Sequence, residues 1–160
     1  MKKLVTLLIS HGVALFIGFA AGIYVLPILI EPEGPTNEAV QAVAEKARYK
    51  VQIKEGLKGS DFLHWGKGEF SISSDTISLM GEVSPGPDYK LYLTPEFVED
   101  EAQFLAIKEK SMRVGDIKTF ENFIVNLPDN IDVEAYGSVV VWCERFGEFI
   151  TAAQYKDATN

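Results

Sequence analysis

The single cysteine of the chain, Cys143, is the residue whose type and position are most suggestive of chemistry. It ends the apolar run Ser138–Cys143, and in a strand Cys143 and Arg145 would share one face, with Trp142 on the other. A neighbouring guanidinium would favour the reactive thiolate, whereas apolar surroundings would keep the thiol protonated and inert. The sequence therefore leaves two alternatives: a redox or ligand cysteine with Arg145 as thiolate stabiliser, or a buried cysteine that packs as a small hydrophobe.

His64 is the second candidate, because imidazole and thiolate are natural partners for haem iron or a transition metal. It could approach Cys143 in the fold and act as a base or as a second ligand. The alternative is a histidine beside a turn that bonds to the backbone, since two ligands without a third rarely make a metal site. Trp142 is a further candidate for contact with a cofactor. We therefore assign no metal ligands. The identity of a cofactor is left open, and a haem or a metal is possible.

Motifs that would identify a cofactor or a reaction are missing from the sequence. No CxxCH motif is present, which excludes covalent c-type haem. Neither a P-loop nor a GxGxxG motif is present to hold a nucleotide. No local signature indicates the orienting group and the oxyanion hole that a Cys-His hydrolase would need. An enzymatic activity is therefore uncertain from the sequence.

Length and charge limit the classes of protein to consider. The chain has 160 residues, enough for one domain with a tail or an anchor, and its 47% hydrophobic and 24% charged residues are typical of a folded protein. All 23 acidic residues lie from Glu31 onward, whereas only two of the 15 basic residues precede it. This acidic part has no basic cluster for a phosphate backbone, so we expect no nucleic-acid partner.

Residues 4–30 form a nearly continuous apolar run that follows Lys2 and Lys3. At about 1.5 Å per residue, a helix of this length exceeds the hydrocarbon core of about 30 Å. The run therefore predicts a single transmembrane signal anchor in the cell membrane. The alternative is a cleaved signal peptide with Ala20, Ala21 and Gly22 near the cleavage site, but the apolar run continues well past that point.

The charges around this segment also predict its orientation. Lys2 and Lys3, with no acid near them, favour a cytoplasmic N-terminus, which places the rest of the chain in the periplasm or outside the cell. Ala14, Gly18 and Gly22 lie four residues apart on one helix face, and such small residues could allow a homodimer through close helix packing.

The chain between the anchor and the main domain reads as a linker with a short helix. Residues 31–36 contain prolines that prevent helix continuation. Residues 37–50 then show helical spacing of apolar residues, with Thr36 or Asn37 available as N-cap. The expected organisation is an anchor over residues 1–30, a linker with a helix over 31–50, a β domain over 51–155 and a tail over 156–160.

From Val51 onward, apolar residues recur at every second position, as in half-buried strands. Phe70 and Ile72 begin this pattern, and turn signals stand near Ser74 and Pro85. About eight or nine short strands predict an all-β fold, either an antiparallel β-sandwich or a small barrel. The run 138–143 is apolar on both faces and is expected in the middle of a sheet. The later candidate strands are residues 105–110, 112–120, 123–127, 138–143 and 149–155.

Several motifs in residues 51–155 resemble the DM-thirteen domain family. The most specific is YGSVVVWCERF at residues 136–146, which is similar to the family signature y-x-SVVIWC-x-x-F. Gly59 and His64 resemble the opening of the family, and Gly86-Pro-Asp before residues 89–93 resembles its "GPD, then a strand" motif. One segment departs from the pattern, because residues 119–123 replace a glycine-rich stretch.

The resemblance implies an all-β electron-transfer domain on the outer face of the membrane. Cys143 would be its redox or cofactor-contacting residue, and a redox protein would be its partner. We therefore expect a membrane-anchored redox accessory protein rather than a stand-alone enzyme. The alternative is a non-catalytic β-sandwich that binds an envelope or surface partner, with Cys143 packed in its core. Neither the electron donor nor the acceptor can be read from the sequence.

Overall fold

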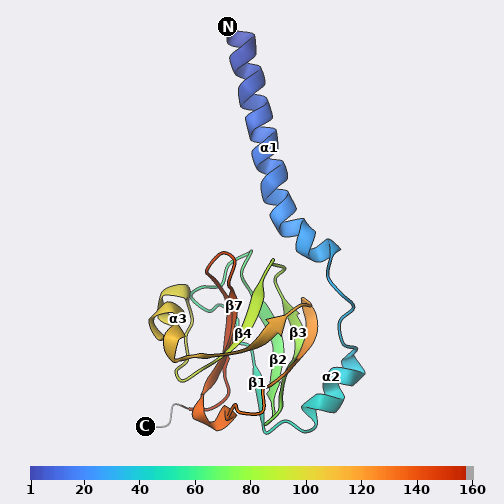
Figure 1. Cartoon of the computed structure of the whole chain (residues 1–160), viewed down its shortest axis with the longest axis vertical. Coiled ribbons are helices and arrows are strands. Elements are labelled where there is room, and N and C mark those ends of the chain that lie inside the picture. The colour runs from blue at the N-terminus through green and yellow to red at the C-terminus, as the bar shows by residue number, and fades with distance from the viewer. Residues whose placement is uncertain (158–160) are drawn as a thin grey trace.

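Two four-stranded antiparallel sheets pack face to face in the computed structural model, which describes residues 1–157 (Figure 1). The strand orders are β1-β2-β3-β6 and β5-β4-β7-β8. The prediction of an all-β fold is confirmed, and the two separate sheets support the sandwich over the barrel. Within residues 1–157 the strands are Tyr49–Gln52 (β1), Gly66–Ile72 (β2), Thr76–Val83 (β3), Tyr89–Thr94 (β4), Met112–Ile117 (β5), Glu121–Asn126 (β6), Ser138–Cys143 (β7) and Glu148–Gln154 (β8).

The core lies between the inner faces of the two sheets. Phe70 and Leu79 come from one sheet, Leu91 and Val141 come from the other, and none of the four is exposed to solvent. Because side chains alternate along a strand, each strand sends every second residue into this layer. Burial of one such side chain contributes about 1.5–3 kcal/mol, so the layer dominates the stability of the fold.

Strand β7 lies inside its sheet, between β4 and β8, as its two apolar faces predict. Val139, Val141 and Cys143 face the core between the sheets. Val140 and Trp142 face a second apolar cluster on the outer side of the same sheet. The predicted alternation is therefore confirmed, and it separates Cys143 from its neighbour Trp142.

The prediction of a strand over residues 105–110 is wrong. This segment lies in helix α3 (Glu101–Ile107) and in the 3-10 turn η1 (Lys108–Lys110). The carboxylate of Asp100 caps the helix by accepting a hydrogen bond from the Gln103 N–H at 2.8 Å. Phe104 is fully buried on the outer cluster whereas Leu105 is exposed, which is the one-sided pattern of a surface helix. The next predicted strand, 112–120, ends at Ile117, where the chain turns toward β6.

Helix α2 (Asn37–Ala44) is shorter than predicted. Its N-cap is Thr36, whose hydroxyl accepts a hydrogen bond from the Ala39 N–H at 3.2 Å, as one of the two alternatives expected. The helix does not reach residue 50, because the chain joins the first sheet there. The Arg48 N–H donates to the Ile72 carbonyl at 2.8 Å, and β1 begins at the next residue.

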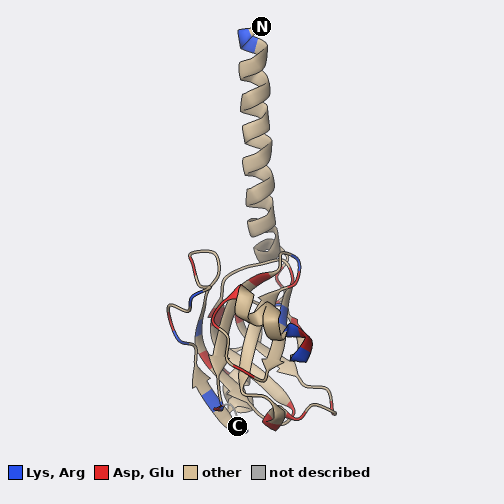
Figure 2. Ribbon diagram, turned by 90° about the vertical axis from the view of Figure 1, so that its left-hand side faces the viewer, with Lys and Arg blue, Asp and Glu red and all other residues tan. Residues whose placement is uncertain are grey.

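Helix α1 (Lys2–Leu29) stands away from one end of the sandwich (Figure 1). Lys2 and Lys3 at its start are its charged residues, and acidic side chains are confined to the rest of the chain (Figure 2). Its length and composition are sufficient to cross a membrane, and a signal sequence would meet the same criterion. Nearly all its apolar side chains are exposed, so the helix needs an apolar environment that the sandwich does not supply.

The linker after α1 is held against the sandwich. It runs down one side of the molecule to α2 (Figure 1). The Phe120 N–H donates to the Glu31 carboxylate at 2.6 Å, and the Asn122 side-chain amide donates to the Asn37 side chain at 2.7 Å. Gly34 lies so close to the sandwich that a Cβ there would be 3.1 Å from the Glu121 carbonyl oxygen. These contacts restrain the linker at both of its ends.

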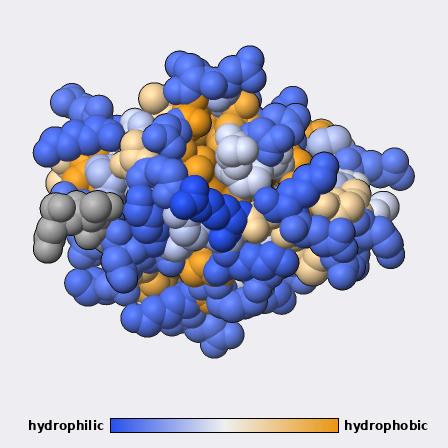
Figure 3. Space-filling model, turned by 90° about the horizontal axis from the view of Figure 1, so that it is seen from below, coloured by the Kyte–Doolittle hydropathy of each residue, from blue (hydrophilic) through white to orange (hydrophobic). Residues whose placement is uncertain are grey.

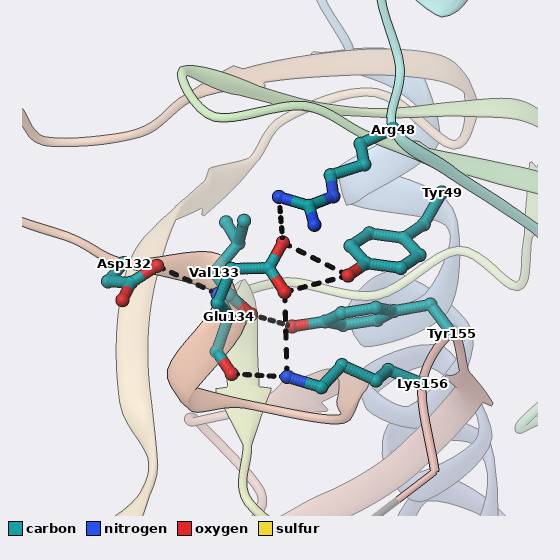
Figure 4. Close-up of polar contacts among 7 residues, drawn as sticks. All are labelled: Arg48, Tyr49, Asp132, Val133, Glu134, Tyr155 and Lys156. Atoms are coloured by element: carbon teal, nitrogen blue, oxygen red, sulfur yellow. Dashed lines mark hydrogen bonds and ion pairs between the residues drawn. The ribbon is translucent and has the colours of Figure 1, made fainter.

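The carboxylate of Glu134 links several segments at the end of the sandwich away from α1. Glu134 lies in the 3-10 turn η2 (Val133–Ala135) and accepts a hydrogen bond from the Tyr49 hydroxyl at 2.7 Å (Figure 4). It also pairs with Arg48 at 2.9 Å and with Lys156 at 3.5 Å. The start of β1 and the chain after β8 are thereby joined. Seen from this end, the surface is mostly hydrophilic, with apolar side chains only between polar ones (Figure 3).

Candidate functional site

A cavity of about 370 Å³ lies between α1 and the near end of the sandwich. Ala20, Ile23 and Tyr24 of α1 form one wall. His64 from the loop before β2 and Cys143 from the end of β7 form part of the other. The topology explains this meeting, because the loop before β2 and the β7–β8 turn both lie at the end of the sandwich that faces α1 (Figure 1).

Cys143 is the last residue of β7 and lies opposite Tyr89 of β4 in the register. It is 2% exposed and belongs to the core between the sheets. Burial raises the pKa of its thiol, and the backbone N–H groups of Phe146 and Arg145 oppose that rise only in part. The cysteine is therefore a neutral thiol at neutral pH, because its ordinary pKa is already well above 7.

Arg145 lies exposed in the turn between β7 and β8. It influences Cys143 through its backbone N–H. The sequence left open whether a cation or apolar surroundings would control the thiol, and the second now dominates. This environment favours the neutral thiol of Cys143 over the thiolate. Nothing in residues 1–157 supports the prediction that the Arg145 guanidinium stabilises a thiolate.

His64 is held by the turn in which it lies. Asp61 accepts hydrogen bonds from the Leu63 N–H at 2.7 Å and from the His64 N–H at 2.8 Å. A second Asp61 oxygen lies 3.2 Å from His64 Nδ1. His64 therefore lies beside a turn, but its imidazole contacts the Asp61 carboxylate and not the backbone. It also lines the cavity that Cys143 reaches. No hydrogen bond within residues 1–157 joins His64 to Cys143.

Metal binding would need more than these two residues. Within residues 1–157 no group of three His, Cys, Asp or Glu side chains is arranged to hold a metal ion. Cys143 and His64 could supply at most two ligands, and exogenous ligands would have to complete the coordination. A small organic ligand needs only the cavity itself, whose volume lies in the range of about 300–1,000 Å³ that is typical of ligand sites.

Trp142 does not lie where it could contact a cofactor that is bound at Cys143. It is buried beneath α3, with its ring 4.7 Å from the Phe104 ring. Lys108 Nζ lies 5.2 Å from the Trp142 ring centre and forms an ion pair with Glu144 at 2.7 Å. The Tyr92 hydroxyl donates to the same carboxylate. Trp142 therefore belongs to an aromatic and ionic cluster on the outer face of the sheet.

Sequence reasoning missed this outer cluster because it placed a strand where α3 lies. With residues 105–110 taken as a strand, Phe104 and Lys108 had no reason to approach Trp142. The available signal was the combination of Asp100 and Glu101, which are typical of an N-cap and a first helical turn. The cavity beside Cys143 could not be read from the sequence, since it depends on how α1 meets the sandwich.

Comparison with protein families identifies a family to which the chain belongs. The model of a family described as electron transfer DM13 matches residues 59–155. The match extends from the loop before β2 to the end of β8 and includes both His64 and Cys143. No curated protein and no solved structure matches significantly.

Proposed function

The chain belongs to the electron transfer DM13 family, and from this premise we propose that it is a membrane-anchored electron-transfer accessory protein. In this proposal α1 crosses the cell membrane and holds the sandwich on the periplasmic or extracellular side. Cys143 is then the redox-active residue or the residue that contacts the electron carrier. A redox protein or a small carrier at the membrane surface supplies or removes the electron.

The observation that carries this proposal is the position of the Cys143 cavity. An electron-transfer domain needs a short path between its redox group and its partner. Cys143 and His64 line a cavity whose other wall is α1, so the path to the membrane is short. A site at the far end would instead face only water.

The environment of Cys143 also limits the chemistry. Because burial raises the pKa of the thiol, the group is protonated at neutral pH. A protonated thiol is a poor nucleophile and a poor ligand for soft metals. The proposed role is therefore one-electron oxidation of the thiol to a thiyl radical, in which the partner or carrier takes the electron and solvent takes the proton, and the reverse of that step. The alternative role is contact with a carrier held in the cavity, and neither role requires attack by a thiolate.

The orientation in the membrane follows from the charges. Lys2 and Lys3 precede α1, and the acidic sandwich follows it. The positive-inside rule then supports a cytoplasmic N-terminus and an external sandwich. The cleaved signal peptide is the competing outcome, and it would release the sandwich and remove one wall of the cavity.

A second function is favoured by one observation. Cys143 is 2% exposed and packs in the core with Tyr89 and Val141. This is the ordinary environment of an inert cysteine that acts as a small hydrophobe. If that is its whole role, the protein is a non-catalytic β-sandwich that binds a partner in the envelope or at the surface.

Coulometric titration separates the two functions, because it measures how many electrons the chain exchanges. The full chain, isolated in detergent from its membrane, is titrated coulometrically with one-electron mediators. We expect the wild-type chain to exchange electrons and Cys143→Ala to lose most of that capacity. Val140→Ala, a buried change on the other face of β7, is the control for loss of packing and should behave like wild type. Equal exchange by wild type and Cys143→Ala, or none by either, contradicts the proposal.

A further inference from the structure

The cavity beside Cys143 lies at the depth where a membrane helix leaves the hydrocarbon. A core of about 30 Å corresponds to about 20 helical residues. If it begins near Leu4, it ends near Ile23 and Tyr24, two residues that line the cavity. Tyrosine is enriched at this boundary, because its ring is apolar and its hydroxyl is polar. With α1 in a bilayer, the cavity therefore opens at the boundary between lipid and water.

The rim of the cavity carries large apolar side chains that nothing in the sandwich covers. Leu63 is 40% exposed and Phe146 is 52% exposed, and both line the cavity. Phe62, beside Leu63 in the same loop, is 83% exposed. Such a group of exposed apolar side chains next to a membrane helix indicates contact with lipid. A ligand can therefore enter the cavity from the bilayer without crossing water.

The cavity lining is mainly apolar but includes the polar side chains of His64 and Glu148, and the surroundings of His64 set up one of its ring nitrogens to accept a hydrogen bond. The Asp61 carboxylate beside His64 Nδ1 favours the tautomer that carries its proton on this nitrogen. Nε2 is then an acceptor, and it has no hydrogen-bond partner within residues 1–157. A phospholipid acyl chain in the cavity would leave this acceptor unsatisfied, which costs free energy. A ligand whose apolar body carries a hydroxyl would satisfy it.

We propose that this cavity binds the ring of a membrane quinol, the reduced form of a lipid-soluble quinone. A quinol combines a compact ring with hydroxyl donors and a long apolar tail. Its ring fits a cavity of about 370 Å³, one hydroxyl donates to His64 Nε2, and the tail lies in the bilayer beside Ala20 and Ile23 of α1. The inference rests on the proposed electron-transfer function, because it names the small carrier that the site would serve.

The test uses the full chain in lipid nanodiscs and a decyl hydroquinone with a photoreactive diazirine on its tail. We expect labelling of peptides that contain residues 20–24 and residues 62–64, and we expect unlabelled decyl hydroquinone to compete. Its dimethyl ether, which cannot donate a hydrogen bond, should compete about tenfold less well. Decylbenzene, which has no oxygen, should compete no better. Equal competition by all three compounds means that the cavity binds any apolar chain, and the quinol proposal is then wrong.

Two matched variants of α1 locate the site. Ala20→Phe fills the cavity, whereas Ala21→Phe places the same ring about 100° further round the helix. We expect about tenfold weaker labelling of Ala20→Phe, since a ring inserted into a formed site displaces the ligand, and wild-type labelling of Ala21→Phe. Both variants leave the sandwich core untouched, and circular dichroism of each in the nanodisc confirms its fold. Equal labelling of the two variants places the quinol elsewhere and overturns the proposal.

The same experiment distinguishes this proposal from the electron-transfer function itself. Labelling of a wild-type chain that exchanges no electrons would keep the quinol site and refute the function. Electron exchange without labelling would keep the function and refute the quinol site.

Discussion

At the scale of single residues, Cys143 shows how burial can override a neighbouring charge. Arg145 is two positions away on the sequence, and in a continued strand it would lie on the same face as the thiol. The strand ends at Cys143, so Arg145 enters a turn and faces solvent. What remains around the sulfur is the core, and desolvation becomes the largest influence on its pKa.

The pH dependence of alkylation tests this directly. For the full chain in detergent, we expect the rate of Cys143 alkylation to rise at a higher pH in the native state than in a denatured sample. The sign follows from the raised pKa of the thiol, because less thiolate is present at any given pH in the folded chain. Since the chain has one cysteine, mass spectrometry reports this residue alone. A native rate that reaches its plateau at lower pH than the denatured rate would contradict the structure.

At the scale of elements, α3 is the part of the fold that differs most from expectation. It covers the outer face of the β5-β4-β7-β8 sheet, which would otherwise leave Tyr92 and Trp142 exposed to water. Phe104 and Ile107 are its contacts with that cluster, and the centre of the Phe104 ring lies 5.1 Å from that of Tyr92 and 4.7 Å from that of Trp142. Together with Leu57 and Val98 from outside the helix, α3 thus builds a second core on this face of the sheet.

A pair of alanine variants measures the contribution of this contact. Phe104→Ala should lower the free energy of unfolding by about 3–5 kcal/mol, because it removes a fully buried aromatic side chain. Leu105→Ala, in the same helix but 49% exposed, should change it by no more than about 0.5 kcal/mol. Urea unfolding followed by tryptophan fluorescence measures both values. Similar effects for the two variants would mean that α3 does not pack on the sheet as described.

The strands were easier to predict than the short helices α2 and α3 for a physical reason. Alternation over four or more residues identifies a half-buried strand, and β7 was placed correctly because both its faces are apolar. The stretch 105–110 gave too short a pattern to separate a helix from a strand, and the decisive capping by Asp100 lay outside it. The N-cap Thr36 was recognisable, whereas the end of α2 depends on pairing of β1 with the distant β2.

The site was predictable only in part. The signature around Cys143 identified the residue and the family, and the strand pattern placed it correctly in a sheet. Its surroundings could not be predicted, because they come from distant segments: Tyr89 of β4, the turn at His64, and α1. Trp142 was expected near a cofactor, but alternation along β7 turns it to the opposite face of the sheet.

At the scale of the whole molecule, the two ends of the sandwich differ in character. The end beside α1 exposes Phe62, Leu63 and Phe146, whereas the opposite end is mostly hydrophilic (Figure 3). Glu134 and its ion pairs fasten that far end (Figure 4). Such a difference between the two ends is expected of a domain that has one end against lipid and the other in water.

A reporter fusion tests the proposed topology. Alkaline phosphatase, which needs disulfides and is active only outside the cytoplasm, is joined after Asn160. We expect an active fusion in the membrane fraction, with a mass that includes residues 1–30. Replacing Lys2 and Lys3 with glutamate should reduce the activity, because the positive-inside bias is removed. An active but soluble fusion that lacks the first 20 or so residues would instead mean a cleaved signal peptide.

In the proposed membrane-anchored role, the restrained linker would orient the sandwich toward its electron carrier. A domain on a flexible linker rotates freely. A carrier that diffuses in the plane of the membrane would then mostly collide with a face of the domain that lacks the site. Here Glu31 is hydrogen-bonded to Phe120 and Asn37 to Asn122, and these contacts restrict that rotation. The entropy of orientation is lost once, on folding, instead of at each encounter. With α1 in the membrane as proposed, a carrier that diffuses in the plane of the membrane would meet the end of the sandwich where Cys143 lies.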